Sequence, residues 1–305
     1  MGQDTEVNEV KMKDSKPNNF QLTWLPKKTF EILATIPWSE IEKAKKKAIF
    51  EAGKTMEIKG FRKGKAPEKM VLENLSSGKL LQLTLQELIP DYYQKAISNF
   101  GLSPILTPKA ELVSAKENED WQVKFTSCEE PQINLGNYKE ELRKLKSVGL
   151  IWTPEKGTPK PSSDSVSKPE EKEGKLEKII QHLEQTIKIE VSDLLIEAEV
   201  NRKLAELLDQ IQKLGLTLEQ YLSSTGKTVD SLKQEYKNQA EKTLRLQFLL
   251  SRISEAEKIE VTPAEIEKAI SSAKNEEEKK ALESQKYLLA SLIRQQKTLD
   301  FLANL

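Results

Sequence analysis

Apolar residues alternate with polar ones in two stretches of the first 130 residues, which predicts β-strands there. In the first stretch, Phe20 to Pro37, the apolar positions are Leu22, Trp24, Phe30, Ile32, Ala34 and Ile36. In the second, residues 104 to 130, the alternating positions are Trp121, Val123 and Phe125, after a polar turn near Asn118 to Asp120. A period of two places one face of a strand on a core. We expect a strand pair or one bent strand in the first stretch and two strands in the second.

Between these stretches apolar residues recur every three or four positions, which predicts helices. One helix should begin at Ser39, whose hydroxyl can cap the first turn while Glu42 completes a capping box. Its apolar residues are Ile41, Ala44, Ala48, Ile49 and Ala52. Pro67 should open a short helix, and Gly78 should end it before a second helix over residues 79 to 99, which Pro90 would interrupt or kink. These elements predict a small α+β domain.

From Leu176 onward the apolar positions follow the helical period almost without interruption. Helix boundaries are predicted by N-cap residues and by glycines: Ser192, Thr217 with Gln220, Thr228 and Thr262 with Glu265 at the starts, and Gly215 and Gly226 at the ends. A long helix should end at Ala256, and a last helix should run from about Glu276 to the end. The second part is therefore expected to be an elongated, all-α domain.

The region from Leu145 to Lys175 has a different composition. It contains Pro154, Pro159, Pro161 and Pro169 among Gly, Ser, Lys and Glu residues, and such a stretch has too few apolar residues to form a core. Trp152 is the exception, and we expect it to pack on a neighbouring helix. The predicted organisation is a tail or frayed strand over 1–20 (near Val7 to Met12), a first domain over 21–131, an extended connection and linker over 132–175, and a helical domain over 176–305.

A short glycine-bounded segment connects the first two predicted helices. It reads Gly60, Phe61, Arg62, Lys63, Gly64, Lys65, Ala66 and Pro67. Glycine permits sharp backbone turns, so an aromatic ring and two cations should lie at the tip of a tight loop. The alternative from the residues alone is a solvated turn with Phe61 in the core. An exposed tip of this kind suits a partner with negative charge and stacking surfaces, such as RNA.

Positive charge concentrates around this segment although the 305-residue chain has no net charge. From Lys43 to Lys65 there are nine cations and two acids. The cations are Lys43, Lys45, Lys46, Lys47, Lys54, Lys59, Arg62, Lys63 and Lys65. A local basic region on a neutral protein indicates contact with a polyanion at one place. We therefore expect Lys43, Lys46 and Lys47 to support the loop with a basic helical face, although such a row is more often only solvated.

Other features exclude several functions. With Cys128 and His182 as the only residues of their types, an internal disulfide is impossible, a multi-histidine metal site is unexpected, and no catalytic residues are predicted. Cys128 should be a small buried or half-buried residue and His182 a surface residue. Gly53 and Gly226 each begin a Gly-Lys-Thr triplet, but the earlier glycine of a phosphate-binding loop is absent. We expect no nucleotide, metal or other cofactor, no membrane span and no secretory signal.

The segment Gly60 to Pro67 resembles the ribosome-binding signature of the trigger factor family, and its tip corresponds to Phe61, Arg62 and Lys63. Further similar segments lie at Pro131 to Tyr138, Glu190 to Leu195, Gly215 to Leu222, Thr225 to Thr228, Ala256 to Glu265 and Lys297 to Leu302. The resemblance covers most of residues 21–305. It implies a ribosome-binding first domain, with Gly60, Phe61, Arg62, Lys63, Gly64, Lys65 and Pro67 as contact residues, and a SurA-like helical domain that binds unfolded polypeptides.

The resemblance also implies what the protein does. The expected partners are the large ribosomal subunit near the tunnel exit, through ribosomal protein and rRNA, and unfolded nascent polypeptides, in the cytoplasm and without ATP. Members of the family usually carry an inserted prolyl-isomerase domain of about 100 residues. Here a linker of about 30 residues stands in its place, so we expect no isomerase activity.

Three other functions stay open at this point. One is an enzyme, which a prolyl-peptide isomerisation assay would test directly. A SurA-like holdase could act away from the ribosome, although the polar start of the chain argues against an envelope compartment. An RNA-binding regulator could use the basic loop alone. Binding to ribosomes but not to free RNA duplexes would separate these possibilities.

Overall fold

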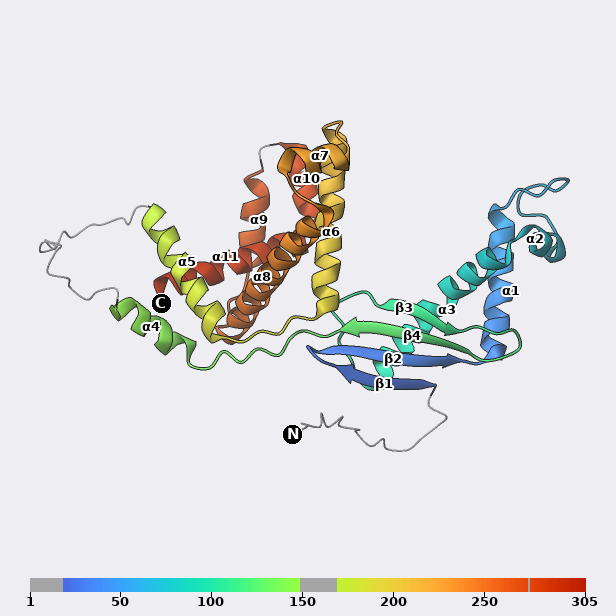
Figure 1. Ribbon diagram of the computed structural model, residues 1–305, viewed down its shortest axis with the longest axis horizontal. Helices are drawn as coiled ribbons and strands as arrows, with labels where there is room; N and C mark the ends of the chain where they lie inside the picture. The colour runs from blue at the N-terminus through green and yellow to red at the C-terminus, as the bar shows by residue number, and fades with distance from the viewer. Residues whose placement is uncertain (1–18, 149–168, 274) are drawn as a thin grey trace, which may run out of the picture. The chain divides into compact units, whose positions relative to one another are not determined.

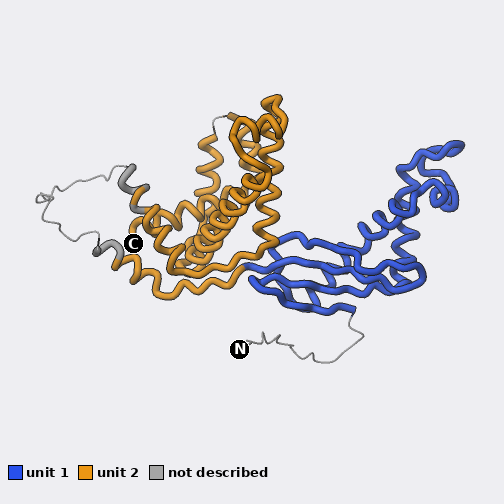
Figure 2. Tube along the Cα trace, in the orientation of Figure 1, with its two compact units in different colours: residues 1–130 blue, residues 131–305 orange. Residues whose placement is uncertain are grey.

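The computed structural model describes residues 19–148, 169–273 and 275–305 and divides the chain into two compact units (Figure 2). Unit 1 ends at Glu130 and unit 2 begins at Pro131. The expected frayed strand near Val7 to Met12 and the expected packing of Trp152 lie outside the described residues. The fold is α+β, with a small antiparallel sheet in unit 1 and helices throughout the described part of unit 2 (Figure 1).

The sheet of unit 1 has four antiparallel strands in the order β1-β2-β4-β3. They are β1 (Phe20–Leu25), β2 (Thr29–Ile36), β3 (Lys109–Ser114) and β4 (Trp121–Cys128). The first stretch is thus a strand pair rather than one bent strand, because Lys27 and Lys28, with φ of 60° and 55°, form a tight turn between β1 and β2. Two separate strands also form over residues 109–128, as the alternation predicts.

One face of this sheet carries the core of unit 1. The inward residues of β2 and β4 are Phe30, Ile32, Ala34, Ile36, Trp121, Val123 and Phe125. They pack against the first part of α1 (Trp38–Thr55) and the second part of α3 (Ser77–Phe100), through Ile41, Ala44, Leu88, Tyr92 and Ala96. These residues follow the periods of two and 3.6 that the sequence shows. Cys128 is fully buried, within the range expected for it.

The starts of both long helices in unit 1 differ from expectation. The helix α1 begins at Trp38 instead of Ser39. The backbone N–H of Trp38 donates a hydrogen bond of 2.8 Å to Oδ1 of Asp120 in the β3–β4 turn. The predicted Ser39–Glu42 capping box is therefore wrong, because a residue distant in sequence supplies the cap. Likewise Gly78 does not end a helix: Ser76 caps α3, which includes Gly78 and continues through Pro90.

Unit 2 consists of helices around the long helix α8 (Val229–Ala256). The others are α4 (Tyr138–Val148), α5 (Pro169–Thr186), α6 (Asp193–Lys213), α7 (Leu218–Thr225), α9 (Pro263–Ser271), α10 (Glu276–Ser284) and α11 (Lys286–Asn304). The main core joins α5, α6, α8 and α11 through side chains such as Leu183, Ile196, Leu249 and Leu302. A smaller core at the far end of α6 joins Leu207 and Ile211 to Leu232 of α8.

The connection between the two predicted domains is more structured than expected. Residues 132–175 were expected to be extended, yet α4 lies within this range and α5 begins there. Tyr138 and Leu142 of α4 are buried in the main core of unit 2. The Tyr138 hydroxyl and the Lys139 ammonium each donate 2.7 Å to the carboxylate of Glu257. The apolar pair at spacing four was missed because the surrounding residues are mostly charged.

Most helix boundaries in unit 2 agree with their capping signals. Thr217 and Thr262 form complete capping boxes with Gln220 and Glu265. Ser192 is at the N-cap position of α6, but its side chain makes no capping bond. The expected single last helix is two helices, α10 and α11, with Gln285 between them.

His182 is not the surface residue that the sequence suggested. It is half-buried on α5, with Nε2 3.9 Å from Oε2 of Glu141 on α4. This Nε2 atom is buried without a hydrogen-bond partner among the described residues.

Candidate functional site

The glycine-bounded loop connects α1 to α2 (Glu68–Asn74), at the end of α1 that points away from the sheet (Figure 1). Gly60 and Gly64 have φ of 92° and 79°, a region that other residues rarely adopt. Two tight turns result, in which the Phe61 N–H donates to the Ile58 carbonyl and the Lys65 N–H to the Arg62 carbonyl, at 3.0 and 2.9 Å. The glycines are therefore required for the backbone path of the loop.

A small core supports the base of the loop. Ala52 of α1, Ile58 and Val71 of α2 are buried together, separately from the core on the sheet. Gly53 allows this close packing, since a Cβ there would lie 3.1 Å from Cγ2 of Val71. Pro67 precedes α2 as its N-cap residue, one position before the expected helix start. The base of the loop is thus held by a small apolar core, and the side chains at the tip are not part of this core.

The tip of the loop is turned to solvent. Phe61 is 42% exposed, so the alternative in which its ring is in the core does not hold. Arg62, Lys63 and Lys65 are exposed too, and none of them has an acidic partner among the residues that the structure describes. An aromatic ring and three cations are therefore available together for a ligand.

The supporting basic face on α1 is weaker than the sequence count suggests. The Lys46 ammonium lies 3.3 Å from Glu42, and Lys47 pairs with Glu87 of α3. The hydrogen bond to Glu87 raises the pKa of Lys47. Of the three predicted residues, only Lys43 lacks an acidic partner within the described part of the chain. Intrachain pairing thus leaves the available positive charge mainly on the loop.

Two further lysines of α1 make contacts with aromatic rings. The Lys45 ammonium lies 4.4 Å from the ring centroid of Trp38 and 5.5 Å from that of Trp121. The Lys54 ammonium lies 4.5 Å from the ring centroid of Phe50, which is 56% exposed. Phe50 is a candidate contact residue that sequence reasoning missed, because its position beside Ile49 reads as part of the core face. Its place within the basic stretch was the signal that could have identified it.

Unit 2 exposes apolar side chains at several separate places. Leu208, Leu214, Leu216 and Val229 lie around α7, and Tyr287, Leu288 and Leu292 lie on α11. Leu214 is 74% exposed at the end of α6. Such residues can bind an apolar segment of another chain, and they are spread over the unit instead of forming one pocket.

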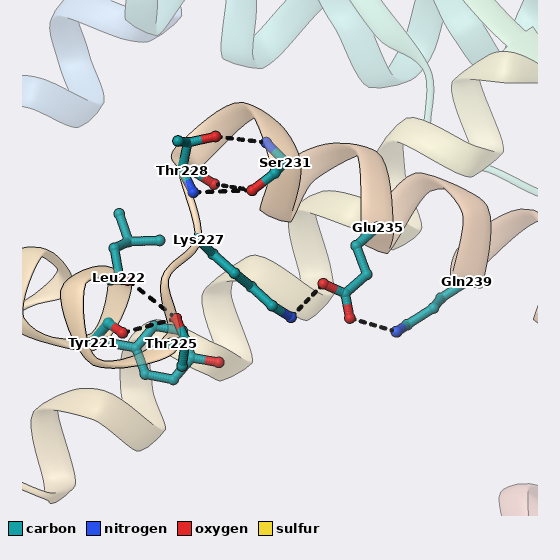
Figure 3. A network of polar contacts seen from close by, with 8 residues as sticks. All are labelled: Tyr221, Leu222, Thr225, Lys227, Thr228, Ser231, Glu235 and Gln239. Carbon is teal, nitrogen blue, oxygen red and sulfur yellow. Dashed lines mark hydrogen bonds and ion pairs between the residues drawn. The ribbon is translucent and has the colours of Figure 1, made fainter.

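Polar contacts fix the turn that carries part of this apolar surface. Figure 3 shows the junction between α7 and α8, where Lys227 pairs with Glu235 and Thr228 exchanges capping bonds with Ser231. Gln239 donates to the same Glu235 carboxylate at 3.3 Å. The hydrogen bond to Glu235 raises the pKa of Lys227. The exposed Val229 is thus held in place by bonds on both sides of it.

The described residues contain no cluster of three or more His, Cys, Asp and Glu side chains that could hold a metal ion. Over the same residues, no helix combines the length and the apolar character that crossing a membrane requires.

Comparison with known families gives matches over most of the chain. The model of the bacterial trigger factor protein (TF) matches residues 19–148, and the model of its C-terminus matches residues 167–304. Between the two matched ranges lie residues 149–166.

Curated relatives align mainly over one part of the chain. The trigger factor of Listeria innocua is 34% identical over 116 residues, which are 37% of this chain and 26% of that protein. The trigger factor of Streptococcus agalactiae is 29% identical over 109 residues, or 36% of this chain and 26% of that protein. The aligned part of the chain thus spans about a quarter of the length of these relatives.

A solved structure extends the similarity to the fold of nearly the whole chain. It is described as "Promiscuous Substrate Recognition in Folding and Assembly Activities of the Trigger Factor Chaperone". The TM-score is 0.62 at 15% identity, over 93% of this chain and 99% of that one. At this identity the similarity shows the fold alone.

Proposed function

The chain belongs to the trigger factor family, and from that premise we propose that it is an ATP-independent chaperone of the cytoplasm. It docks at the nascent-chain exit of the large ribosomal subunit and holds emerging unfolded polypeptides. Two regions divide this work: the loop from Gly60 to Pro67 binds the ribosome, and the exposed apolar surface of unit 2 binds the client.

The observation that carries the proposal is the solvent-facing tip of the loop. Phe61 is exposed between two glycines with positive φ, beside Arg62 and Lys63, which have no acidic partner in the described chain. Arginine and lysine bind phosphates, and an aromatic ring can stack on an unpaired base or pack on protein. Ribosomal RNA and a ribosomal protein near the exit offer both kinds of surface.

Holding a client needs only weak, repeated contacts. Because the loop keeps the protein near the exit, the local concentration of apolar surface around the emerging chain is high. The client then leaves as its own folding buries the apolar segments, so no nucleotide is consumed.

We further propose that the protein does not catalyse prolyl isomerisation. Residues 149–166, between the two matched ranges, are far fewer than the roughly 100 residues of a typical domain. The uncatalysed barrier is about 18–20 kcal/mol, and lowering it requires a formed pocket around the proline. A peptide isomerisation assay at micromolar protein tests this, and a clear catalytic rate would refute it.

Co-sedimentation with ribosomes tests the docking. Replacement of Phe61, Arg62 and Lys63 together by Ala should lower the bound fraction at least about tenfold, because contact residues at a small interface carry most of its free energy. A matched pair of variants, R62A/K63A and K27A/K28A, removes the same charge from two different turns of unit 1. Only the first of the pair should lose binding.

Unchanged sedimentation of the triple variant would overturn the docking proposal. Equal loss for both double variants would show that general charge, not the loop, is responsible. A parallel titration of the same variants with a free RNA duplex tests the alternative of an RNA-binding regulator. For such a regulator, the affinity for the duplex and the affinity for the ribosome would fall together in R62A/K63A.

A further inference from the structure

A cavity of about 250 Å³ lies in unit 2 between α8 and α11. Polar side chains from both helices line it, namely Gln247 and Ser251 of α8 and Ser291, Arg294 and Gln295 of α11. The ring of Tyr287 stands at its edge and Val261 closes one wall. None of the residues that line it belongs to the loop from Gly60 to Pro67.

The cavity carries one positive charge, for which the described part of the chain supplies no acidic partner. Arg294 is the sole charged residue among those that line it. Its guanidinium has no acidic partner within the described ranges, in contrast to Arg252 on α8, which lies 3.1 Å from Glu255. A guanidinium presents five N–H donors in a planar fork that fits a carboxylate.

The neighbouring polar groups are also free to bind a ligand. The side chains of Gln247, Gln295, Ser251 and Ser291 have no hydrogen-bond partner among the described residues, whereas the hydroxyl of Ser254 donates 2.7 Å to the Ser251 carbonyl. Amide N–H and hydroxyl groups can donate to an anion. The cavity thus combines one full positive charge with several neutral donors.

Apolar surface continues outward from the cavity. Tyr287 is 92% exposed, so its ring packs on almost nothing among the described residues. Leu288 and Leu292, one helical turn apart on α11, are 54% and 53% exposed. An apolar ridge beside a cationic cavity suits a peptide segment better than a free phosphate or a nucleotide.

Contacts outside the cavity hold its wall in place. The Lys297 ammonium of α11 donates 2.6 Å to the Glu260 carbonyl and lies 2.8 Å from Oε1 of Glu265. These bonds fasten the residues on both sides of Val261 to α11. A cavity that is already formed costs less to occupy, because less of the chain must be ordered on binding.

We propose that this cavity binds a carboxylate of a client peptide, with Arg294 as its counter-charge and Tyr287, Leu288 and Leu292 as contacts for the adjoining apolar residues. The volume is below the roughly 300–1,000 Å³ of sites that enclose a whole small molecule. It fits one acidic side chain or one chain end. This inference rests on the proposed holding of unfolded polypeptides and specifies which segments are held most tightly.

Fluorescence anisotropy with four labelled peptides tests the proposal on the full chain. The peptides share one apolar sequence with Glu or Gln at its centre, and each is made with a free or an amidated C-terminus. The wild-type protein should prefer a carboxylate-bearing peptide over the neutral one about three- to tenfold. A preference that follows the Glu identifies the side chain as the source, and one that follows the free terminus identifies the chain end.

Variants of the cavity separate charge from apolar contact. The substitution R294Q should abolish the preference, so that all four peptides bind with similar affinity, and R294K should restore part of the preference. The matched control R252Q removes an arginine outside the cavity. It should keep the preference for carboxylate-bearing peptides. Y287A should weaken all four peptides alike.

Two outcomes would overturn the inference: no preference in the wild-type protein, or an equal preference in R294Q. Suppression of client aggregation is measured on the same samples. If the wild-type protein suppresses aggregation but shows no preference, the cavity assignment fails alone. If it does not suppress aggregation at all, the holding function itself fails.

Discussion

The loop of unit 1 and the apolar surface of unit 2 are built in opposite ways. The loop concentrates Phe61, Arg62 and Lys63 on three consecutive positions and rests on a small core that these residues do not join. In unit 2 the exposed apolar residues are spread over α6, α8 and α11. The difference suggests that ribosome binding can be removed by a local change, whereas holding a client can only be reduced in steps.

The two regions also differ in how substitutions should affect folding. Side chains at the tip of the loop contribute little to a core, so their removal should leave the fold intact. Unit 2 also depends on a short helix, α4, which lies before the undescribed stretch and contributes Tyr138 and Leu142 to the main core. Substitutions in α4 should therefore affect stability first and function only as a consequence.

The largest expected effect is on the stability of unit 2. L142A should lower its free energy of unfolding by about 2–5 kcal/mol, because Leu142 is 1% exposed and its loss leaves a cavity. Chemical denaturation followed by circular dichroism measures this. F61A is the control and should change stability by no more than about 0.5 kcal/mol. A similar loss in both variants would contradict the separation of loop and core.

The next effect concerns salt. Ribosome binding should weaken about tenfold between roughly 50 and 200 mM salt if the loop contacts two or three phosphates. Client holding, which relies on apolar surface, should change little over the same range. Sedimentation and aggregation assays at matched salt concentrations measure both. If ribosome binding is insensitive to salt, the loop contacts protein through Phe61 and not phosphate through its cations.

The sequence predicts the elements of the fold better than their ends. Alternation at Phe30, Ile32 and Phe125 identifies the strands, and Thr217 and Thr262 mark helix starts, because both signals are local. The cap of α1 by Asp120 could not be predicted, since the two residues are brought together only by the sheet. The burial of Tyr138 likewise depends on Glu257, 119 positions away in the chain.

The candidate loop was predictable because its signals are local too. Positive φ at Gly60 and Gly64 follows from residue type, and exposure of the cations follows from their charge. The pairing of these lysines with acidic residues was not predictable in the same way. Lys47 reads as a free cation in the sequence, but Glu87 of α3 lies beside it once the two helices pack.

A smaller effect should follow from changes at the end of α6, where Leu214 and Leu216 are exposed. L214S together with L216S should raise the protein concentration needed to suppress client aggregation by about twofold. Each leucine could contribute as much as about 1.5–3 kcal/mol if a client buried it fully, but the other exposed residues still bind. Light scattering with an unfolded client measures this. Complete loss of suppression would show that the client site is concentrated at the end of α6 and is not spread over unit 2.

The smallest effect is a dependence of stability on pH. The hydrogen bond from Lys139 holds the pKa of Glu257 below its ordinary value of 4.5, with a further contribution from Tyr138. A group with a lowered pKa in the folded state stabilises it above the unfolded value, and this stabilisation is lost as the pH falls through the folded value. E257Q should therefore be less stable than the wild type at neutral pH.

The stability difference between E257Q and the wild type should shrink as the pH falls below 4.5, because Glu257 becomes neutral as well. Thermal unfolding of both proteins over this range measures it. A difference that does not change with pH would mean that the negative charge of Glu257, and with it the ion pair with Lys139, contributes nothing to stability.

The central claim is that ribosome docking and client holding reside in separate parts of the chain. The most direct test measures both activities on one preparation of the F61A/R62A/K63A variant. We expect ribosome co-sedimentation to be lost and suppression of aggregation in the absence of ribosomes to equal that of the wild type. Retained sedimentation, or loss of both activities in a variant that unfolds like the wild type, would contradict the account.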